Sequence, residues 1–395
     1  MISFDEAIDI IARTARPLGS ETVPVEQAGG RVLSRPVVAQ IAAPRWDVSA
    51  MDGYALRSAD LSALPARLNV VGESFAGAGS RIEVATGQCV RIFTGAAIPG
   101  GADRVVIQEE VGREGDVAIV GAWPGEATHI RRRGGDFREG DELLARGRLL
   151  DPRAIVAAAA ADVPAVDVYR QPTLQILGTG DELAEPGTAA KREDAIPDSV
   201  SLGVAALARQ WGARLTARLR LADELQSLVE AAGEAVRSAD VVVVTGGASV
   251  GERDFAKAMF EPAGLELAFS KVAIKPGKPV WLGRAGDALV MGLPGNPTSA
   301  MVTGRLLLAP LLAAMTGRGV SEALQWRSAP LASNLDSSGA REAFHRGCWA
   351  GDQVRLFSNQ DSSAQKLLAE ADLLVRQPPG AAAQAAGSNV DVLDF

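Results

Sequence analysis

The sequence predicts a multidomain α/β protein whose central sheet is parallel. From about residue 172 to residue 244, strand-like and helix-like segments alternate, which is typical of βαβ units with right-handed crossovers. Within this run, four consecutive valines at 241–244 indicate a strand that is covered on both faces. Short apolar segments separated by Gly and Pro precede and follow this region, so a β-rich unit is expected on each side of it.

Length and composition limit the classes of function. The 395 residues suggest two to four domains, and the formal net charge of −8 argues against a general nucleic-acid surface, which needs a clustered basic face. The two cysteines and two histidines cannot build a disulfide framework or a zinc site. Residues 3 to 6 form a capping box before an amphipathic helix rather than a signal peptide, and no apolar run approaches the roughly 20 residues of a bilayer span. We therefore expect a cytoplasmic protein with no nucleic-acid or membrane partner.

The first 162 residues predict helices on either side of a β-rich stretch. Asp151 is a helix cap with Pro152 at the first helical position. Three arginines at 131–133 stand beside Asp136; a charge run is usually a solvated face, but this short run next to two glycines could receive an anion. The segments expected here are a helix at 3–16, strands at 22–25 and 32–38, a small β-domain at 68–130 and a helix at 151–162.

The second half predicts the parallel sheet and then a small β-barrel or sandwich. Asn296 and Pro297 cap and open a long apolar helix that runs to about Met315. The other segments expected are strands at 174–177, 215–221, 241–244 and 289–293, helices at 199–211 and 225–236, and short strands between 343 and 393.

Polar loops follow three strands of the predicted sheet. Ligands of open parallel sheets bind beyond the carboxyl ends of the strands, so these loops predict a site. The carboxylates of Asp181, Glu182 and Asp254, without His or Cys, suit Mg²⁺. Lys275 and Lys278 flank a Pro-Gly turn and can balance phosphate charge. The residues therefore predict a phosphorylated or nucleotide-bearing ligand with Mg²⁺.

Other nucleotide and hydrolase motifs fit less well. The chain has no Walker P-loop, and no dinucleotide fingerprint stands at the first strand-to-helix turn. Residues 247–251 match the Gly-x-Ser-x-Gly nucleophile elbow. A hydrolase triad would also need an acid and His345, which lies in a distal β segment, and it would leave both lysines unexplained.

Seven motifs in order resemble the molybdopterin molybdenumtransferase family, MoeA and the E domain of gephyrin. The resemblance covers essentially the whole chain. The motifs are Asp47-Val48-Ser49-Ala50-Met51-Asp52-Gly53-Tyr54-Ala55, Arg91-Ile92-Phe93-Thr94-Gly95-Ala96, the run 131–136, Gly180-Asp181-Glu182-Leu183, the run 245–254, Lys275-Pro276-Gly277-Lys278-Pro279 and Gly292-Leu293-Pro294-Gly295-Asn296-Pro297.

The resemblance implies an elongated subunit of four domains. They are a discontinuous helical domain I at 1–43 and 138–170, a β-domain II at 44–137, an α/β domain III at 171–325 like molybdopterin-binding proteins, and a C-terminal β-barrel domain IV at 326–395. It also implies a homodimer whose cleft combines domain III of one subunit with domain II of the other. The implied reaction takes adenylated molybdopterin and molybdate with Mg²⁺, releases AMP and yields molybdenum cofactor.

The resemblance also assigns residues. Asp181, Glu182 and Asp254 would hold Mg²⁺, and Asp52, Thr94 and Asp136 would reach across the dimer, while Arg341 with Ser362 or Ser363 would capture an oxyanion. The catalytic candidates are Asp181, Glu182, Asp254, Lys275, Lys278, Asp52 and Asp136; the substrate-binding candidates are Thr94, Asp198, Ser199, Gly246, Gly247, Ser249, Pro294, Asn296, Arg341, Ser362 and Ser363.

One position departs from the family pattern. The family usually carries Asp-Ser-Asn where this chain has Asp198-Ser199-Val200, and valine has no hydrogen-bonding side-chain group. The change bears on nucleotide or pterin recognition and would suit a variant that serves another final form of the cofactor. Two other functions are kept as alternatives: a non-catalytic molybdopterin-binding or scaffold protein, against which the retained carboxylates and lysines argue, and a molybdopterin adenylyltransferase, against which the full-length resemblance argues. The family also implies docking of molybdopterin adenylyltransferase and downstream cofactor-processing proteins, and the sequence does not separate molybdate from tungstate.

Overall fold

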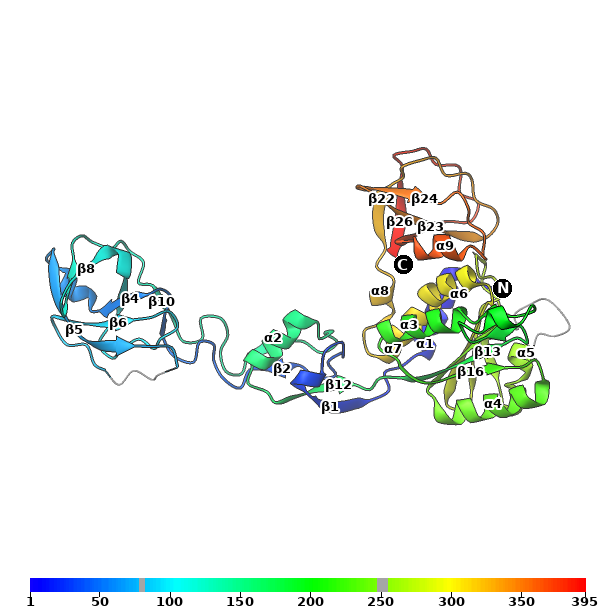
Figure 1. The fold of residues 1–395 in the computed structure, drawn as a ribbon, viewed down its shortest axis with the longest axis horizontal. Helices are drawn as coiled ribbons and strands as arrows, with labels where there is room; N and C mark the ends of the chain where they lie inside the picture. Colours follow the sequence, from blue (N-terminus) through cyan, green and yellow to red (C-terminus); the bar gives the residue numbers. More distant parts are fainter. Residues whose placement is uncertain (78–81, 247–254) are drawn as a thin grey trace.

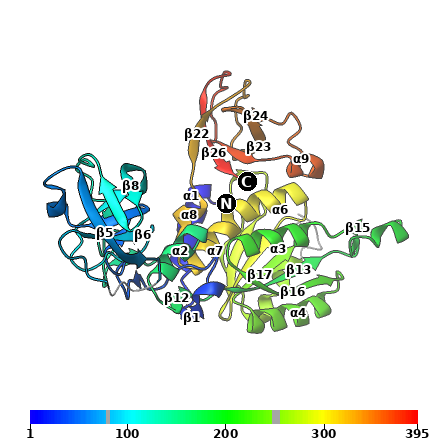
Figure 2. The ribbon, with the colours of Figure 1, turned by 60° about the vertical axis from the view of Figure 1, so that its left-hand side comes forward.

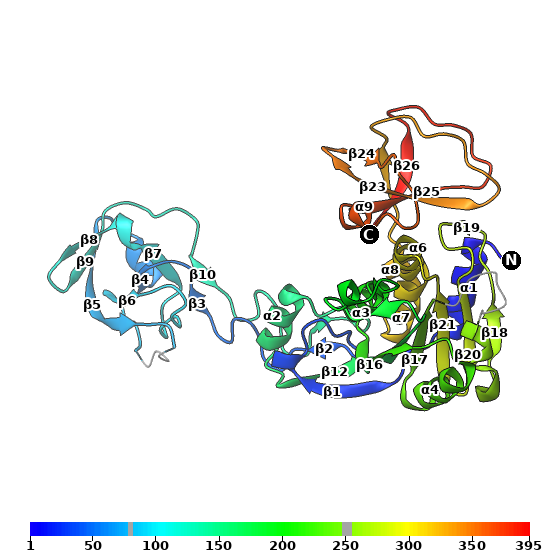
Figure 3. The ribbon, with the colours of Figure 1, turned by 45° about the vertical axis from the view of Figure 1, so that its right-hand side comes forward.

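The computed structural model describes residues 1–77, 82–246 and 255–395. The chain forms an elongated molecule (Figure 1). The β-domain lies at one end, a small elongated domain lies in the middle, and the α/β and C-terminal domains lie together at the other end. Figure 3 shows the same order from another side.

The α/β domain is built on a six-stranded sheet with the order β16-β13-β17-β21-β20-β18. The first four strands pair in parallel, as the sequence predicts. Strand β20 pairs antiparallel with β21, because a short turn joins the two as a hairpin, and β18 pairs antiparallel with β20. The sheet is therefore mixed. Its strands are β13 (Thr173–Thr179), β16 (Arg214–Leu221), β17 (Val241–Thr245), β18 (Glu266–Phe269), β20 (Trp281–Ala285) and β21 (Ala288–Leu293).

Helices cover both faces of this sheet (Figure 2). Val241 and Val243 pack into one core with α1, α3, α6 and α7, and Val242 and Val244 pack into the other with α4 and α5. The valine run thus lies in a strand buried on both faces, as expected. The elements are α1 (Phe4–Thr14), α3 (Val200–Gln210), α4 (Leu225–Ser238), α5 (Phe255–Ala258), α6 (Pro297–Thr303), the π-helix η6 (Gly304–Leu308), α7 (Ala309–Met315) and α8 (Val320–Ala323), with short segments η5 (Glu261–Ala263), β14 (Leu183–Ala184), η4 (Ala189–Lys191) and β15 (Ile196–Pro197).

The continuous helix Pro297–Met315 is long and apolar enough, by composition alone, to cross a bilayer. The expectation that no apolar run reaches this length was therefore wrong. However, 94% of the apolar window is buried inside the protein, where Leu306, Leu311 and Leu312 pack against the sheet. Its composition is accordingly that of a core helix, which is hydrophobic all round because it is buried all round.

The N-terminal helix α1 belongs to the α/β core. We expected residues 1–43 to lie in domain I, but Phe4, Ala7 and Ile11 are buried in the same cluster as the sheet and α7. The helix begins at the predicted capping box, in which Ser3 and Glu6 exchange hydrogen bonds. Its amphipathic face needs an apolar partner, and the α/β core supplies it.

The middle domain joins two distant chain segments. Its core combines Leu33 and Val37 from the first segment with Ala154, Ala158 and Val168 from the second. Strand β1 pairs with β12, and β2 pairs with β11. The elements are β1 (Ser20–Pro24), η1 (Val25–Gln27), β2 (Val37–Val38), β11 (Glu142–Leu144), α2 (Pro152–Ala160) and β12 (Ala165–Tyr169).

The β-domain is inserted into this middle domain. The two chain segments that connect the β-domain to the middle domain lie side by side at Ala43 and Phe137, whose backbones exchange hydrogen bonds. Its sheet has the order β7-β4-β6-β5-β9-β8. The elements are β3 (Val48–Ser49), β4 (Gly53–Leu56), η2 (Ser58–Leu61), β5 (Ala66–Ser74), β6 (Gln88–Ile92), β7 (Arg104–Ile107), η3 (Gln108–Glu110), β8 (Val111–Glu114), β9 (Val117–Val120) and β10 (Ile130–Arg131).

The C-terminal domain is a small β structure with the strand order β19-β23-β25-β26-β22, in which β24 pairs with β23. A bridge between Leu331, just after β22, and Val354 in β24 returns the sheet on itself. Strand β19 (Ile274–Lys275) comes from the α/β region of the sequence but pairs with β23 here (Figure 3). The other elements are β22 (Arg327–Pro330), β23 (Glu342–Ala350), β24 (Gln353–Leu356), α9 (Gln365–Ala369), β25 (Leu373–Gln377) and β26 (Asn389–Asp394).

Candidate functional site

The strand order places a crevice between the carboxyl ends of β13 and β17. The chain passes from β13 outward to β16 and then returns to β17 on the other side of β13, which is a topological switch point. Gly246 follows β17 with φ +93°, and a Cβ atom there would lie 2.4 Å from the Thr179 carbonyl oxygen. Only glycine therefore fits at this edge of the crevice.

A cleft of about 850 Å³ opens at this switch point. It is lined by the ends of β13, β17 and β21, by the start of α3 and by part of the C-terminal domain. The predicted site residues that line it are Glu182, Asp198, Ser199, Gly246, Pro294, Asn296 and Ser363.

The carboxylates near the cleft are arranged unequally. Glu182 lines the cleft, whereas the Asp181 carboxylate accepts a hydrogen bond from the Asp223 backbone N–H at 3.1 Å. Asp223, which the sequence analysis did not single out, also lines the cleft. Among the described residues, no three His, Cys, Asp or Glu side chains cluster as a metal site. The third predicted ligand, Asp254, lies outside the described residues, as do Gly247 and Ser249.

The start of α3 is held by a buried carboxylate. Asp198 is 1% exposed and accepts hydrogen bonds from the Ser201 backbone N–H and hydroxyl and from Arg218 at 2.9 Å. Its carboxylate is thus committed to the fold, and Arg218 also pairs with Glu185. Ser199 and Val200 line the cleft beside it, so Val200 presents a methyl surface where an amide would stand in the usual motif.

A second cavity of about 700 Å³ continues from this cleft and shares Pro279 and Ser299 with it. It lies between the α/β and C-terminal domains. Lys275, Lys278, Arg341 and Ser362, all predicted site residues, line it. Because β19 pairs with β23, Lys275 is held on the C-terminal sheet beside Arg341, whose guanidinium donates to the Ile274 carbonyl oxygen at 3.2 Å. Three cations and one carboxylate, Asp361, thus border one cavity, and the excess of positive charge favours an anionic ligand.

The loop at residues 359–364 closes one side of this cavity. It is organised by Arg346, which is 1% exposed and donates to the carbonyl oxygens of Asn359, Asp361 and Ala364. Arg346 also donates to Thr298 Oγ1 in α6 at 3.4 Å. No role for Arg346 could be predicted from the sequence, because nothing in the sequence of a strand indicates that a single arginine in it is buried.

Ser362 and Ser363 face different parts of the groove. Asn296 Nδ2 donates to Ser362 Oγ at 3.0 Å, and the Thr298 backbone N–H donates to the Ser362 carbonyl oxygen at 3.1 Å. The Ser363 hydroxyl and N–H donate to Asp361, and these hydrogen bonds hold the pKa of Asp361 below its ordinary value. Ser362 lines the cationic cavity, and Ser363 lines the switch-point cleft.

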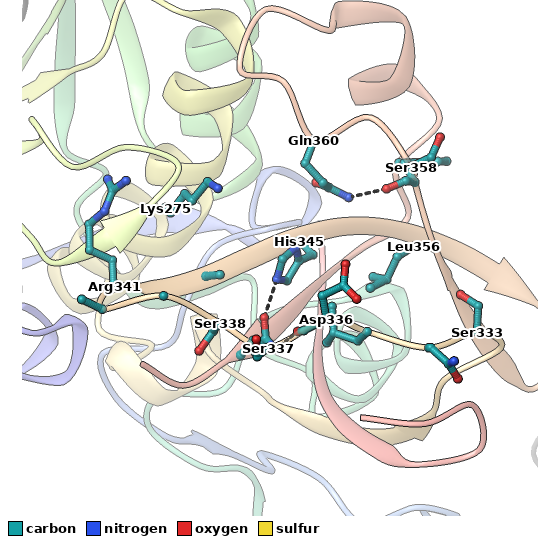
Figure 4. A pocket seen from close by; sticks show the side chains of 17 residues that line it. Lys275, Ser333, Asp336, Ser337, Ser338, Arg341, His345, Leu356, Ser358 and Gln360 are labelled. Atoms are coloured by element: carbon teal, nitrogen blue, oxygen red, sulfur yellow. Dashed lines mark hydrogen bonds between the residues drawn. The ribbon is translucent and has the colours of Figure 1, made fainter. Parts of the chain in front are cut away.

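A third cavity of about 570 Å³ extends the groove into the C-terminal domain (Figure 4). It shares Lys275, Arg341 and His345 with the cationic cavity. Gln377 Nε2 donates to the Asp336 carbonyl oxygen at 2.7 Å, so Gln377 Oε1 is the acceptor that faces His345 Nε2 at 2.9 Å. His345 Nε2 therefore carries a proton. Burial lowers the pKa of His345, and the charge of Lys275 lowers it further, against the opposing effect of the Gln377 hydrogen bond.

The β-domain candidates lie away from this groove within one chain. Asp52 accepts hydrogen bonds from the Thr94 backbone N–H and hydroxyl, both at 2.7 Å, and these bonds lower the pKa of Asp52. Asp136 is exposed near the entrance to the β-domain. Arg132 and the Arg133 backbone N–H instead bind Asp47, at 2.6 Å and 2.8 Å. Figures 1 and 3 place this domain at the far end of the molecule from the cleft.

Three family models match successive parts of the chain. Residues 2–161 match the MoeA N-terminal region (domain I and II), residues 175–314 match a probable molybdopterin binding domain, and residues 328–395 match the MoeA C-terminal region (domain IV). These matches cover the cleft, the cationic cavity and the β-domain.

Curated relatives and solved structures agree with these models. The molybdopterin molybdenumtransferase of Haemophilus influenzae is 36% identical over 88% of this chain and 86% of the relative, and that of Synechococcus elongatus is 33% identical over 99% of each. Two crystal structures of a molybdopterin biosynthesis MoeA protein from Pyrococcus horikoshii superpose with TM-scores of 0.82 and 0.85, at 28% and 26% identity, over all of this chain and 99% or 100% of theirs.

Proposed function

Because this chain belongs to the molybdopterin molybdenumtransferase family, MoeA, we propose that it inserts molybdenum from molybdate into adenylated molybdopterin and releases AMP. The chain is a transferase of molybdenum cofactor biosynthesis. The observation that carries the detailed proposal is the continuity of the switch-point cleft with a cavity bordered by three cations. One large anionic substrate and one small oxyanion can meet where these two spaces join.

The switch-point cleft suits the adenylated pterin. Backbone N–H groups at glycine-rich strand ends and the start of α3 are donors for phosphate oxygens. The cationic cavity suits molybdate, with Lys275, Lys278 and Arg341 as charge partners and Ser362 as a hydroxyl donor.

The proposed reaction balances. Two sulfurs of the substrate replace one oxide ligand of molybdate, and this oxide leaves as water together with the two thiol protons. One water is consumed when the diphosphate bond is hydrolysed. Water therefore balances over the reaction.

Mg²⁺ fits the carboxylate edge of the cleft. The ion typically takes one or two carboxylates together with phosphate oxygens, and Asp181 and Glu182 stand at this edge. Asp254 is the third residue that would hold it. When bound, the ion would offset the charge of the diphosphate. The Asp223 N–H, which donates to Asp181, would keep that carboxylate in place.

We also propose that the active unit is a homodimer. Asp52 and Thr94 cannot reach the cleft of their own chain, because the middle domain separates the two ends of the molecule. The β-domain also exposes large apolar side chains near these residues: Trp46 is 46% exposed, Met51 43% and Phe75 49%. Such side chains indicate a surface that another protein covers, and a second copy would bring Asp52 to the cleft.

The test is to incubate the purified protein with adenylated molybdopterin, Mg²⁺ and molybdate. AMP release and the activation of a cofactor-free molybdoenzyme are followed together. We expect both to depend on molybdate. Tight pterin binding without AMP release would contradict the proposal and favour a carrier or scaffold protein. AMP release at the same rate with and without molybdate would contradict the role proposed for the cationic cavity.

A further inference from the structure

A separate cavity of about 200 Å³ lies at the junction between the middle domain and the α/β domain. Its lining comes from four chain segments: residues 29–32 and 169–171 of the middle domain and its exit, and residues 209–212 and 316–318 at the ends of α3 and α7. It shares no lining residue with the three cavities of the groove. We call it the junction cavity.

The junction cavity is cationic. Arg31, Arg209 and Arg318 line it, and no Asp or Glu stands among its described lining residues. Arg31 pairs with Glu21 at 2.5 Å and donates to the Tyr169 carbonyl oxygen. In the part of the chain that the structure describes, Arg209 and Arg318 form no ion pair within 4 Å, although Glu322 acts on Arg318 through space. Positive charge therefore exceeds negative charge at this point.

The guanidinium groups of Arg209 and Arg318 do not cap the carbonyl groups at the two helix ends. The Ala208 carbonyl oxygen at the end of α3 accepts from the Ala213 N–H, and the Ala313 carbonyl oxygen in α7 accepts from the Arg318 N–H. Gln171 donates to the Gly212 carbonyl oxygen at 3.1 Å. Because the local carbonyl groups already have donors, the guanidinium groups remain available to a ligand.

Trp211 holds one of these guanidinium groups in position. Its side chain lines the junction cavity, it is 7% exposed, and its indole Nε1–H has no acceptor among the described residues. The Arg318 guanidinium carbon lies 4.4 Å from the centre of the Trp211 ring, so the two groups form one surface. The Nε1 atom itself is enclosed by protein atoms, so Trp211 contributes to the cavity through its ring, which holds the Arg318 guanidinium.

We propose that the junction cavity binds a small tetrahedral oxyanion of the phosphate or sulfate class. Arg209 and Arg318 balance its charge, and Arg31 contributes a third cation. A volume of about 200 Å³ accommodates such an ion with water but not a nucleotide. The ion would contact both the middle domain and the α/β domain, so its binding would stabilise their present arrangement.

The experiment is a thermal unfolding titration of the full chain with inorganic phosphate, sodium chloride being added to hold the ionic strength constant. We expect the unfolding midpoint to rise and saturate, because a ligand that binds only the folded state stabilises it. Arg209→Gln, on an exposed part of the cavity wall, should abolish the saturable rise without changing the fold. Arg318→Gln removes the other guanidinium group that has no ion pair among the described residues, so it should raise the half-saturating concentration about tenfold.

Two comparisons make the result specific. Arg341→Gln removes a cation from the groove, and Arg153→Gln removes an exposed arginine from α2; both should keep the saturable rise. In a titration with molybdate, the part of the rise that comes from the groove should be lost in Arg341→Gln and kept in Arg209→Gln. A further part that is lost only in Arg209→Gln would show that the junction cavity also binds the substrate oxyanion. An equal rise in every variant would be the general salting effect of phosphate and would overturn the proposal, as would no rise at all.

Discussion

The side-chain amide of Asn296 donates a hydrogen bond to Ser362 Oγ over 3.0 Å, which joins the cap residue of α6 to a loop of the C-terminal domain. The hydroxyl that is proposed to face molybdate is thus oriented by a residue of the α/β domain. Asn296→Ala should raise the KM for molybdate about tenfold, because one hydrogen bond that orients a donor to a charged ligand is lost. The turnover number should change much less. Steady-state AMP release measures both, with Ser358→Ala as the control, and an unchanged KM would contradict this orienting role.

Arg346 is predicted to hold the loop at 359–364. Its guanidinium donates to three loop carbonyl oxygens and to Thr298, all away from solvent. Arg346→Gln should lower the free energy of unfolding by about 3 kcal/mol, because it leaves buried acceptors without donors. Limited proteolysis should cleave this loop faster in the variant. Arg355→Gln on the neighbouring strand is the control, and equal cleavage rates would show that Arg346 does not order the loop.

Lys275 is predicted to bind the oxyanion rather than to stabilise the fold. Its ammonium group borders two cavities and forms no ion pair among the described residues. Lys275→Ala should weaken molybdate binding roughly 10- to 100-fold and leave the unfolding midpoint nearly unchanged. Calorimetric titration at two salt concentrations measures the loss. Lys271→Ala, outside the groove, should bind molybdate normally; similar losses in both variants would point to a general charge effect.

The stability of the protein should fall in mild acid because of His345. Its folded-state pKa is lowered, first by burial and then by Lys275, while the unfolded histidine titrates near pH 6.5. As the pH falls below about 6.5, the unfolded state takes up the proton first, so stability decreases until the pH passes the folded-state pKa. The slope contributed is at most about 1.4 kcal/mol per pH unit. Unfolding midpoints at pH 7.5 and 5.5 should differ more in the native protein than in His345→Gln, and parallel curves would exclude this cause.

Mixing two impaired variants tests the proposed dimer. Asp52→Ala damages the β-domain contribution and Lys275→Ala weakens molybdate binding in the groove, so at a limiting molybdate concentration each homodimer should have little activity. If each site combines two chains, a mixed dimer has one intact site, and random exchange should restore about a quarter of native activity. AMP release after co-refolding measures this. Absence of any recovery, with mixed dimers present, would place both residues in the same chain's site.

The strand ends could be predicted because their sequence signals are local. A run of four valines predicts a buried strand, and the glycines that follow β13 and β17 mark the carboxyl ends of these strands. The structure confirms that the carboxyl ends of β13 and β17 border one cleft. The pairing of β19 with β23 could not be predicted, because two strand residues carry no periodic signal. The same limit applies to Arg346, whose burial depends on a loop that folds over it.

Long-range packing was the other source of error. The amphipathic pattern of α1 showed that one face must be buried, but not which domain would bury it. Asp198 lines the cleft as expected from its motif, yet its charge is taken by Arg218, which is 20 positions away in the next strand. The local sequence pattern thus predicted the element in which each residue lies. It did not predict which residues of other elements it contacts, because these contacts depend on the tertiary fold.

The backbone pairing of Ala43 with Phe137 has a consequence for folding during synthesis on the ribosome. The β-domain contains every strand of its sheet between these two residues, so it can close as soon as residue 137 has emerged. Helix α1 is made earlier, but its apolar face waits for α7, which is roughly 300 residues later in the chain. At ordinary rates of translation this delay is roughly 15 to 60 s. The β-domain can therefore fold before the α/β domain, and α1, the first helix to be synthesised, is among the last to bury its apolar face.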